Sequence, residues 1–309
     1  MHIPKGRWLA MIIDDPGLAL RKMFVYGAVI AIYVAVIVVS AFTCFGLPIA
    51  ILSILLFIVQ YYYSDRLLLR ATGARTVDRG EVPELYAMME SISAKMGVAP
   101  PRIALIANSV PNAFATGRNE HNAVIVYTTG LLERLDYEEI RAVTAHEMSH
   151  IRNRDMFVVI FAGFTITMLS WAVYMLLHSL FSRKRRSAMA DKVAGVVSWF
   201  LSATIGVILV STVSRYREYN ADINAALVTG NPNALISALK KITMASEREV
   251  GTPEMSHAKA VLTSTASRAI TELFATHPPL KKRIIVIERV RDRMLATAAI
   301  KGVNGNGMR

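Results

Sequence analysis

One short segment holds the residues best suited to chemistry. Residues 144–150 read Thr-Ala-His-Glu-Met-Ser-His, which contains the pattern H-E-x-x-H. His146 and His150 are four positions apart, so on a helix both imidazoles face the same side and can bind one Zn²⁺ ion. Glu147 stands where a carboxylate can hold and deprotonate a water on that ion. The alternative is two solvated histidines on a helix.

Catalytic zinc takes three protein ligands and leaves one position open. The extended form H-E-x-x-H-x-x-G-x-x-H is absent here, so the third ligand lies elsewhere. Glu218 and Asp222 are again four apart, so Glu218 could ligate while Asp222 accepts a hydrogen bond from a ligand histidine. The alternative is a solvated helix end, with Arg215 and Arg217 as partners of the two carboxylates.

The elements that position these residues are visible in the pattern. The helix that carries H-E-x-x-H is expected to begin at Asp136, a candidate N-cap, with Glu139 three residues on. Two apolar runs, 103–107 and 123–127, are typical of β-strands. The segment 112–117 between them is expected to form an edge of a small sheet. Further helices are expected over 80–98, up to the break at Gly230-Asn231-Pro232, and from Pro279 onward.

The composition is not typical of a purely soluble enzyme. Of the 309 residues, 53% are hydrophobic and 19% charged, with a mean hydropathy of +0.39, whereas a soluble domain is about 25% charged. A net charge of +12 fits a basic face toward anionic lipid. No nucleic-acid-binding motif is present, so no nucleic acid partner is expected. The single cysteine, Cys44, excludes an intramolecular disulfide and a cysteine metal site.

Charged side chains are absent from three runs, 23–64, 156–182 and 193–214. A membrane-spanning helix needs about 20 apolar residues, and the first run is long enough for two, with a break at Gly46-Leu47-Pro48. The predicted spans, in two hairpins, are 23–43, 47–63, 156–180 and 193–214. Very hydrophobic buried helices are the alternative.

Two hairpins would bring residues 65–155 and 215–309 to one side of the bilayer. Arginine and lysine residues next to the apolar runs indicate the cytoplasm. The basic loop 183–192 disagrees, because this topology places it outside; either the total bias prevails or the second hairpin does not fully span. The predicted organisation is an N-terminal segment 1–22, hairpin 23–64, catalytic part 65–155, hairpin 156–214, catalytic part 215–301 and a disordered tail 302–309.

Four ordered motifs carry a resemblance that covers nearly the whole chain. They are residues 112–117 (Asn-Ala-Phe-Ala-Thr-Gly), 144–150, 214–222 and 276–280 (Thr-His-Pro-Pro-Leu). With them the sequence resembles the HtpX-type membrane zinc metalloproteases, relatives of the CAAX prenyl proteases. The resemblance implies an α-helical membrane protein with an α+β zincin-like catalytic domain, in which a small β-sheet lies beside the H-E-x-x-H helix.

The resemblance also implies roles for particular residues. It makes His146, His150 and Glu218 the ligands of one Zn²⁺ per subunit, Glu147 the general base and Asp222 a supporting group. His277 would orient the site or stabilise the oxyanion, although a helix-capping role before the two prolines is an equal alternative. The strand of Asn112, Ala113, Phe114 and Ala115 would bind substrate backbone by strand addition.

The activity implied is peptide hydrolysis in quality control of the cytoplasmic membrane. Misfolded membrane proteins would be the substrates, with the catalytic domain facing the cytoplasm and other membrane quality-control proteases as further partners. Two alternatives stay open. A prenyl-protein protease would need a large intramembrane chamber, and a non-catalytic membrane scaffold or metal-binding protein would have no use for Glu147.

Overall fold

The computed structural model describes residues 27, 46–156, 173, 193, 195–197, 217–249 and 279–305. The chain divides into two compact units. The first comprises Met1–Phe57 and Phe161–Tyr216, and the second comprises Ile58–Ile160 and Arg217–Arg309. Every described residue of the candidate site belongs to the second unit, so the fold of that unit is what positions the site.

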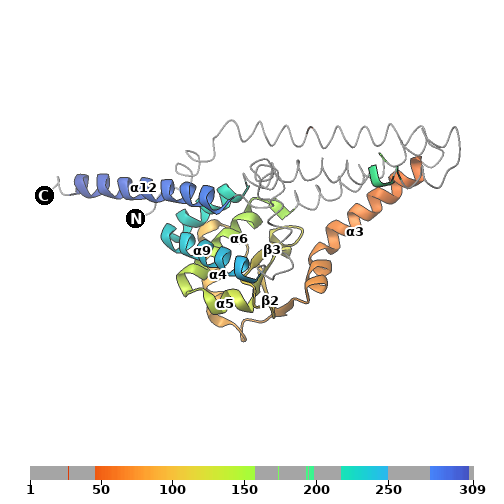
Figure 1. Cartoon of the computed structure of the whole chain (residues 1–309), viewed down its shortest axis with the longest axis horizontal. Coiled ribbons are helices and arrows are strands. Elements are labelled where there is room, and N and C mark those ends of the chain that lie inside the picture. Colours follow the sequence, from red (N-terminus) through yellow and green to blue (C-terminus); the bar gives the residue numbers. More distant parts are fainter. Residues whose placement is uncertain are drawn as a thin grey trace. The chain divides into compact units, whose positions relative to one another are not determined.

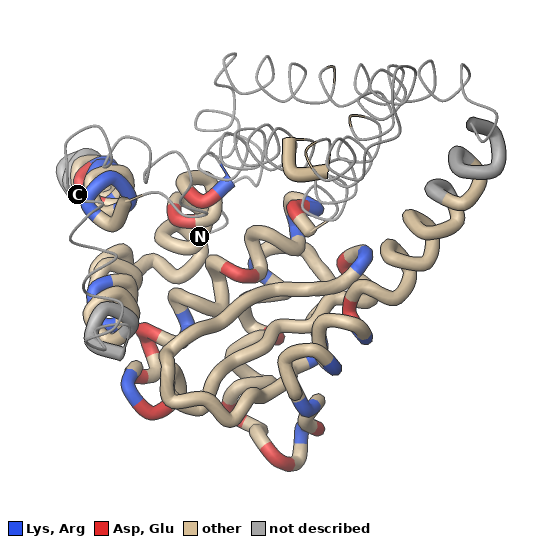
Figure 2. The backbone as a smooth tube through the Cα atoms, turned by 45° about the vertical axis from the view of Figure 1, so that its right-hand side comes forward, with Lys and Arg blue, Asp and Glu red and all other residues tan. Residues whose placement is uncertain are grey.

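A four-stranded mixed sheet is the centre of this unit (Figure 1). Its strands, in spatial order, are β1 (Arg75–Val77), β2 (Arg102–Ile106), β4 (Val124–Thr128) and β3 (Ala113–Thr116). β2 and β4 run parallel, whereas β1 and β3 pair antiparallel with their neighbours. The two predicted strands are confirmed, as is the expectation that residues around 112–117 form an edge. Strand charges are few, and Figure 2 shows the charged residues mainly on helices and loops.

In the chain, α4 lies between β1 and β2, and α5 and α6 follow β4. α4 (Pro83–Met96) begins with Pro at its first turn and ends at Gly97, which has the left-handed conformation (φ 69°) that glycine adopts readily. α5 (Thr129–Arg134) follows β4 directly, and α6 (Tyr137–Arg152) carries H-E-x-x-H. The Asp136 side chain caps α6 by accepting from the Glu139 backbone N–H. The Glu139 carboxylate in turn accepts from the Asp136 backbone N–H, which completes the predicted capping box.

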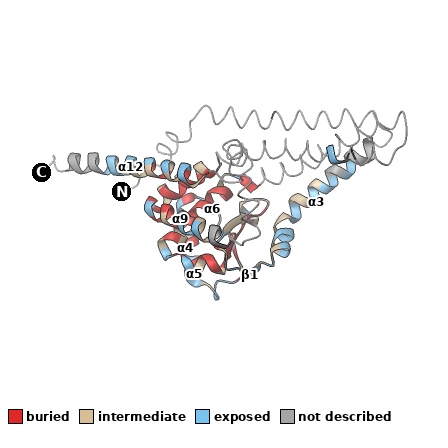
Figure 3. Ribbon diagram, in the orientation of Figure 1, coloured by how far each residue is buried: buried red, intermediate tan, exposed pale blue. Residues whose placement is uncertain are grey.

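Two anchors fix α6 in place. At the sheet, the hydroxyl of the fully buried Tyr127 in β4 lies 2.9 Å from Oγ1 of Thr144, two residues before the first histidine of the motif. At its start, the Glu139 carboxylate accepts bonds from Ser237 Oγ (2.6 Å) and Lys241 Nζ (2.7 Å) of α9 (Pro232–Glu249). Figure 3 shows the resulting buried layer between α4, α6 and α9. The motif therefore lies on a helix held at both the sheet and the neighbouring helix.

The remaining described helices complete the surroundings of α6. Residues 217–229 are helical and end at Gly230 (φ 71°), as the Gly-Asn-Pro sequence predicts. α12 (Leu280–Gly305) begins directly after Pro279, also as predicted. It extends into the segment 302–309, where a disordered tail was expected, because the Ala-rich stretch before it favours continued helix.

Within the described residues, no helix combines the length and apolar character that crossing a bilayer requires. The predicted span 47–63 coincides with part of α3 (Gly46–Thr72), so its role as a span gains no support from the structure. The predicted spans 23–43, 156–180 and 193–214 lie outside the described residues except for a few single positions, and so does the loop 183–192.

Candidate metal centre

Three side chains from two helices converge on one point. His146 and His150, one turn apart on α6, bring their Nε2 atoms to 3.2 Å from each other. Glu218, from the helix over 217–229, places Oε2 at 3.5 Å from Nε2 of His146 and Oε1 at 3.5 Å from Nε2 of His150. All three residues are buried, and one ligand atom from each lies within 4.8 Å of the others. The structure thus brings together the three ligands that the sequence predicts.

In His146 and His150, the environment of Nδ1 determines whether Nε2 has a lone pair for a metal ion. Nδ1 of His150 lies 2.7 Å from Oδ2 of Asp155, and Nδ1 of His146 lies 3.0 Å from Oδ1 of Asp222. With its proton on Nδ1, beside the carboxylate, each neutral ring keeps a lone pair on Nε2. Two lone pairs and a carboxylate would then face one another in a buried space, an arrangement that a cation stabilises.

The spacing suits a small tetrahedral ion. Two ligands at 2.0–2.1 Å from zinc in tetrahedral geometry are about 3.3 Å apart. The observed separations of 3.2, 3.5 and 3.5 Å are close to this value. Histidine nitrogen and carboxylate oxygen are both ligands that zinc takes in proteins. The residues present therefore fit a divalent metal such as zinc.

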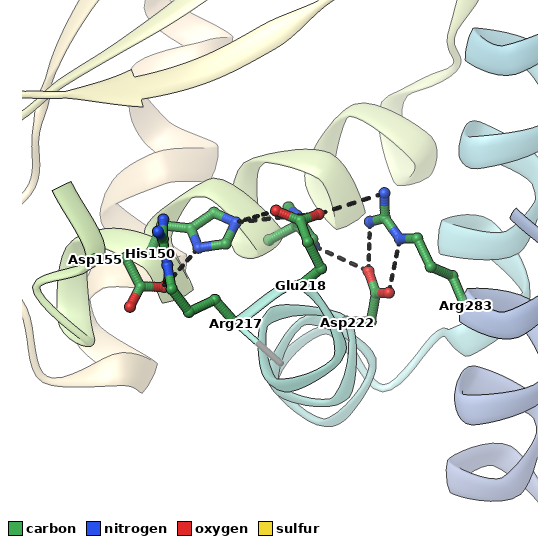
Figure 4. Close-up of polar contacts among 7 residues, drawn as sticks. His150, Asp155, Arg217, Glu218, Asp222 and Arg283 are labelled. Carbon is green, nitrogen blue, oxygen red and sulfur yellow. Dashed lines mark hydrogen bonds and ion pairs between the residues drawn. The ribbon is translucent and has the colours of Figure 1, made fainter. Parts of the chain in front are cut away.

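An arginine from α12 neutralises the acidic side of the cluster (Figure 4). Arg283 donates two hydrogen bonds to the Asp222 carboxylate, from Nε to Oδ2 at 2.8 Å and from Nη2 to Oδ1 at 2.6 Å. Its Nη1 lies 3.5 Å from Oε2 of Glu218. Burial would raise the pKa of Asp222, but the bonds from Arg283 and His146 outweigh it and hold that pKa below its usual range. Asp222 is therefore an ionised acceptor for His146.

The alternative of a solvated helix end is wrong, because Glu218 is 4% exposed and Asp222 is fully buried. Of the two expected arginine partners, the structure describes only Arg217. Arg283, rather than Arg217, pairs with Asp222, and Arg217 forms its ion pair with Asp155 instead. Arg215 lies outside the described residues.

The same carboxylates control the protonation of the two histidines. Burial lowers the pKa of His146, but Asp222 and Glu218 together have the larger, opposite effect and raise this pKa to about 10. The pKa of His150 is also raised, by Asp155 and Glu218 against the effect of burial. In the metal-free protein, a proton on the His146 imidazole therefore competes with a metal ion for the ring nitrogen at any pH below about 10, its raised pKa.

Zinc affinity is consequently expected to increase with pH until the pH reaches about 10, the raised pKa of His146. Each proton displaced should give about a tenfold gain per pH unit. The protonated imidazole also stabilises the metal-free fold below pH 6.5, and this contribution is lost as the pH rises through 10. Competition with a chromogenic chelator at several pH values measures the slope. A pH-independent affinity would contradict the assignment of these histidines as ligands.

The other predicted site residues are placed as follows. Glu147 is buried on α6 next to His146. Ala113, Phe114 and Ala115 form most of the edge strand β3, which contacts α6. Asn112 directly precedes this strand, and its backbone N–H donates to Thr128 Oγ1 at 2.8 Å. His277 lies outside the described residues, so its two alternative roles stay predictions.

Among the described residues, sequence reasoning missed Asp155 and Arg283, and it gave Arg217 other partners than the one it has. Asp155 holds His150, Arg217 pairs with Asp155 at 3.2 Å, and Arg283 holds Asp222. Asp155 had a local signal, since it stands five residues after the second histidine in a short polar segment. The two arginines had none, because their partners are distant in the sequence.

Comparisons with known proteins identify the family of the chain. Residues 81–291 match the model of Peptidase family M48. Protease HtpX homolog 2 of Methanosarcina mazei is 35% identical over 289 residues, which cover 91% of this chain and 97% of that protein. Protease HtpX homolog of Moorella thermoacetica is 37% identical over 296 residues, with the same coverage. The crystal structure of S. mikatae Ste24p gives a TM-score of 0.58 at 18% identity over 90% of this chain and 67% of that one, a likeness in fold alone.

Proposed function

The chain belongs to peptidase family M48 and is a metalloprotease, and from this premise we propose that it is a membrane-bound zinc endopeptidase that cleaves misfolded or damaged membrane proteins. The observation that carries the proposal is the convergence of His146, His150 and Glu218 directly beside Glu147. A mere metal store has no use for the glutamate, which argues against a non-catalytic scaffold.

The chain's own residues supply the proton chemistry and the positioning. His146, His150 and Glu218 would hold one Zn²⁺, which supplies Lewis-acid polarisation of the scissile carbonyl and a more acidic water. Glu147 takes the proton of the attacking water and delivers it to the leaving amine. Asp222 and Asp155 keep the two imidazoles in the tautomer that ligation requires.

The edge strand β3 is the proposed place for the substrate backbone. Among the described strands, β3 pairs only with β4, so its other edge can pair with an extended peptide. β3 contacts α6, the helix that carries the H-E-x-x-H motif. A strand added there would run beside that helix, which supports Asn112 to Ala115 as a substrate-binding segment.

Membrane attachment is supported by the charge-free runs of the sequence and by apolar side chains on α3. Ile51, Leu55 and Leu56 are among its exposed residues, and exposed apolar surface of this kind is typical of interaction sites. A catalytic domain on the cytoplasmic side, as the flanking basic residues indicate, would meet damaged membrane proteins there. Other membrane quality-control proteases are the further partners we propose.

The test compares substrates for the purified full-length chain. We expect cleavage of an unfolded membrane protein in zinc-replete buffer, its loss with a chelator and its recovery with added zinc. Cleavage of a prenylated CAAX peptide but not of the membrane protein would favour the prenyl-protein protease instead. Absence of proteolysis on both substrates would favour the scaffold.

A further inference from the structure

The second histidine of the motif ends a chain of three polar side chains, of which His150 and Asp155 are buried and Arg217 is half-buried. Nδ1 of His150 lies 2.7 Å from Oδ2 of Asp155, and the same oxygen lies 3.2 Å from Nε of Arg217. Asp155 is 4% exposed, and the Arg217 side chain is 15% exposed. Figure 4 shows Arg217 and Asp155 together on one side of the cluster, with Arg283 and Asp222 on the other.

The Asp155–Arg217 ion pair connects two segments that are distant in the sequence. Asp155 belongs to the short segment that follows α6, where Arg154 adopts a left-handed backbone (φ 56°) and the chain turns so that Asp155 returns to His150. Arg217 directly precedes Glu218 on the next described helix. The Asp155–Arg217 pair therefore joins the two segments that supply the second and third ligands.

We propose that Arg217 is a positioning residue, which through Asp155 fixes the His150 imidazole and holds Glu218 in register with it. The inference rests on the proposed metal site. A carboxylate that orients a ligand histidine is commonly worth 10–100-fold in metal affinity, and a buried carboxylate needs its partner charge. Loss of the guanidinium lets Asp155 and His150 move together, and the link to the Glu218 helix is lost with it.

The contribution is read from the loss of metal rather than from activity. Purified full-length chains loaded with Zn²⁺ are mixed with excess chromogenic chelator, and the dissociation rate is measured. We expect Arg217→Gln to accelerate dissociation about tenfold, at the lower end of such effects, and to shift the visible absorption spectrum of the Co²⁺ form. Arg141→Gln is the matched control, because Arg141 also pairs with a carboxylate, Glu138 at 2.9 Å, on the same helix as the histidines but away from them.

A double-mutant cycle with Asp155→Asn tests the route. If Arg217 acts through Asp155, Arg217→Gln adds little to the rate in the Asp155→Asn background. Arg217→Lys keeps the charge without the planar fork, so its rate should fall between wild type and Arg217→Gln. Should Arg217→Gln not fold, the lysine variant against wild type decides in the same way.

Two results would overturn the proposal. One is that Arg217→Gln lowers only the melting temperature of the metal-free protein, while the zinc dissociation rate and the Co²⁺ spectrum stay as in wild type. Arg217 would then have a purely structural role. The other is full multiplication of the two single effects in the double variant. A wild-type chain that binds neither Zn²⁺ nor Co²⁺ would instead overturn the proposed function itself.

Discussion

Glu147→Gln should abolish peptide cleavage while leaving the metal in place. The amide is nearly isosteric with the carboxylate but cannot accept the proton of the attacking water, and general acid–base catalysis is commonly worth about 10²–10⁴ in rate. Glu147 is not among the three side chains whose ligand atoms converge, so bound zinc should remain near one per chain. The cleavage rate of an unfolded membrane protein and elemental analysis of the same sample are the measurements.

Glu138→Gln is the matched control for this change. Glu138 lies on the same helix α6, but its side chain is 44% exposed and pairs with Arg141. We expect wild-type cleavage from the control. Equal activity of Glu147→Gln and Glu138→Gln would remove Glu147 from the mechanism.

His146→Ala should lose the metal and, with it, the activity. His146 supplies one of three converging ligand atoms. Its Nδ1 also lies 3.0 Å from Oδ1 of Asp222, whose carboxylate accepts two hydrogen bonds from Arg283. Loss of a ligand should cost more than the 10–100-fold in affinity that loss of a supporting group costs. Zinc content after dialysis against a weak chelator measures the effect.

His121→Ala serves as the control, because the His121 side chain is 73% exposed and pairs only loosely with Glu120, at 3.7 Å. It should retain wild-type zinc. Retention of one zinc per chain by His146→Ala would show that the ion is held elsewhere.

The centre of the site could be predicted because helical geometry is local. Four-residue spacing alone places His146 and His150 on one face, and the same spacing drew attention to Glu218 and Asp222. The capping pair Asp136 and Glu139 predicted where the helix begins, and it does begin there. Each of these inferences needed only neighbouring residues.

The supporting charges could not be predicted, because they depend on tertiary contacts. Arg217 and Asp155 are 62 positions apart, and Arg283 and Asp222 are 61 apart. No periodicity links such pairs, and long side chains such as arginine have many alternative partners. Burial distinguishes the two interpretations of Asp222, but burial is not visible in the sequence. A solvated helix end and a buried, paired carboxylate such as Asp222 therefore look alike there.

The most direct test of the central claim is to determine zinc content and cleavage rate on the same preparations of wild type and Glu147→Gln, with and without chelation and zinc restoration. The account predicts one zinc per chain in both proteins, cleavage by wild type that disappears on chelation and returns with zinc, and no cleavage by Glu147→Gln under any condition. Cleavage by the zinc-loaded variant, or by wild type stripped of its metal, would contradict it.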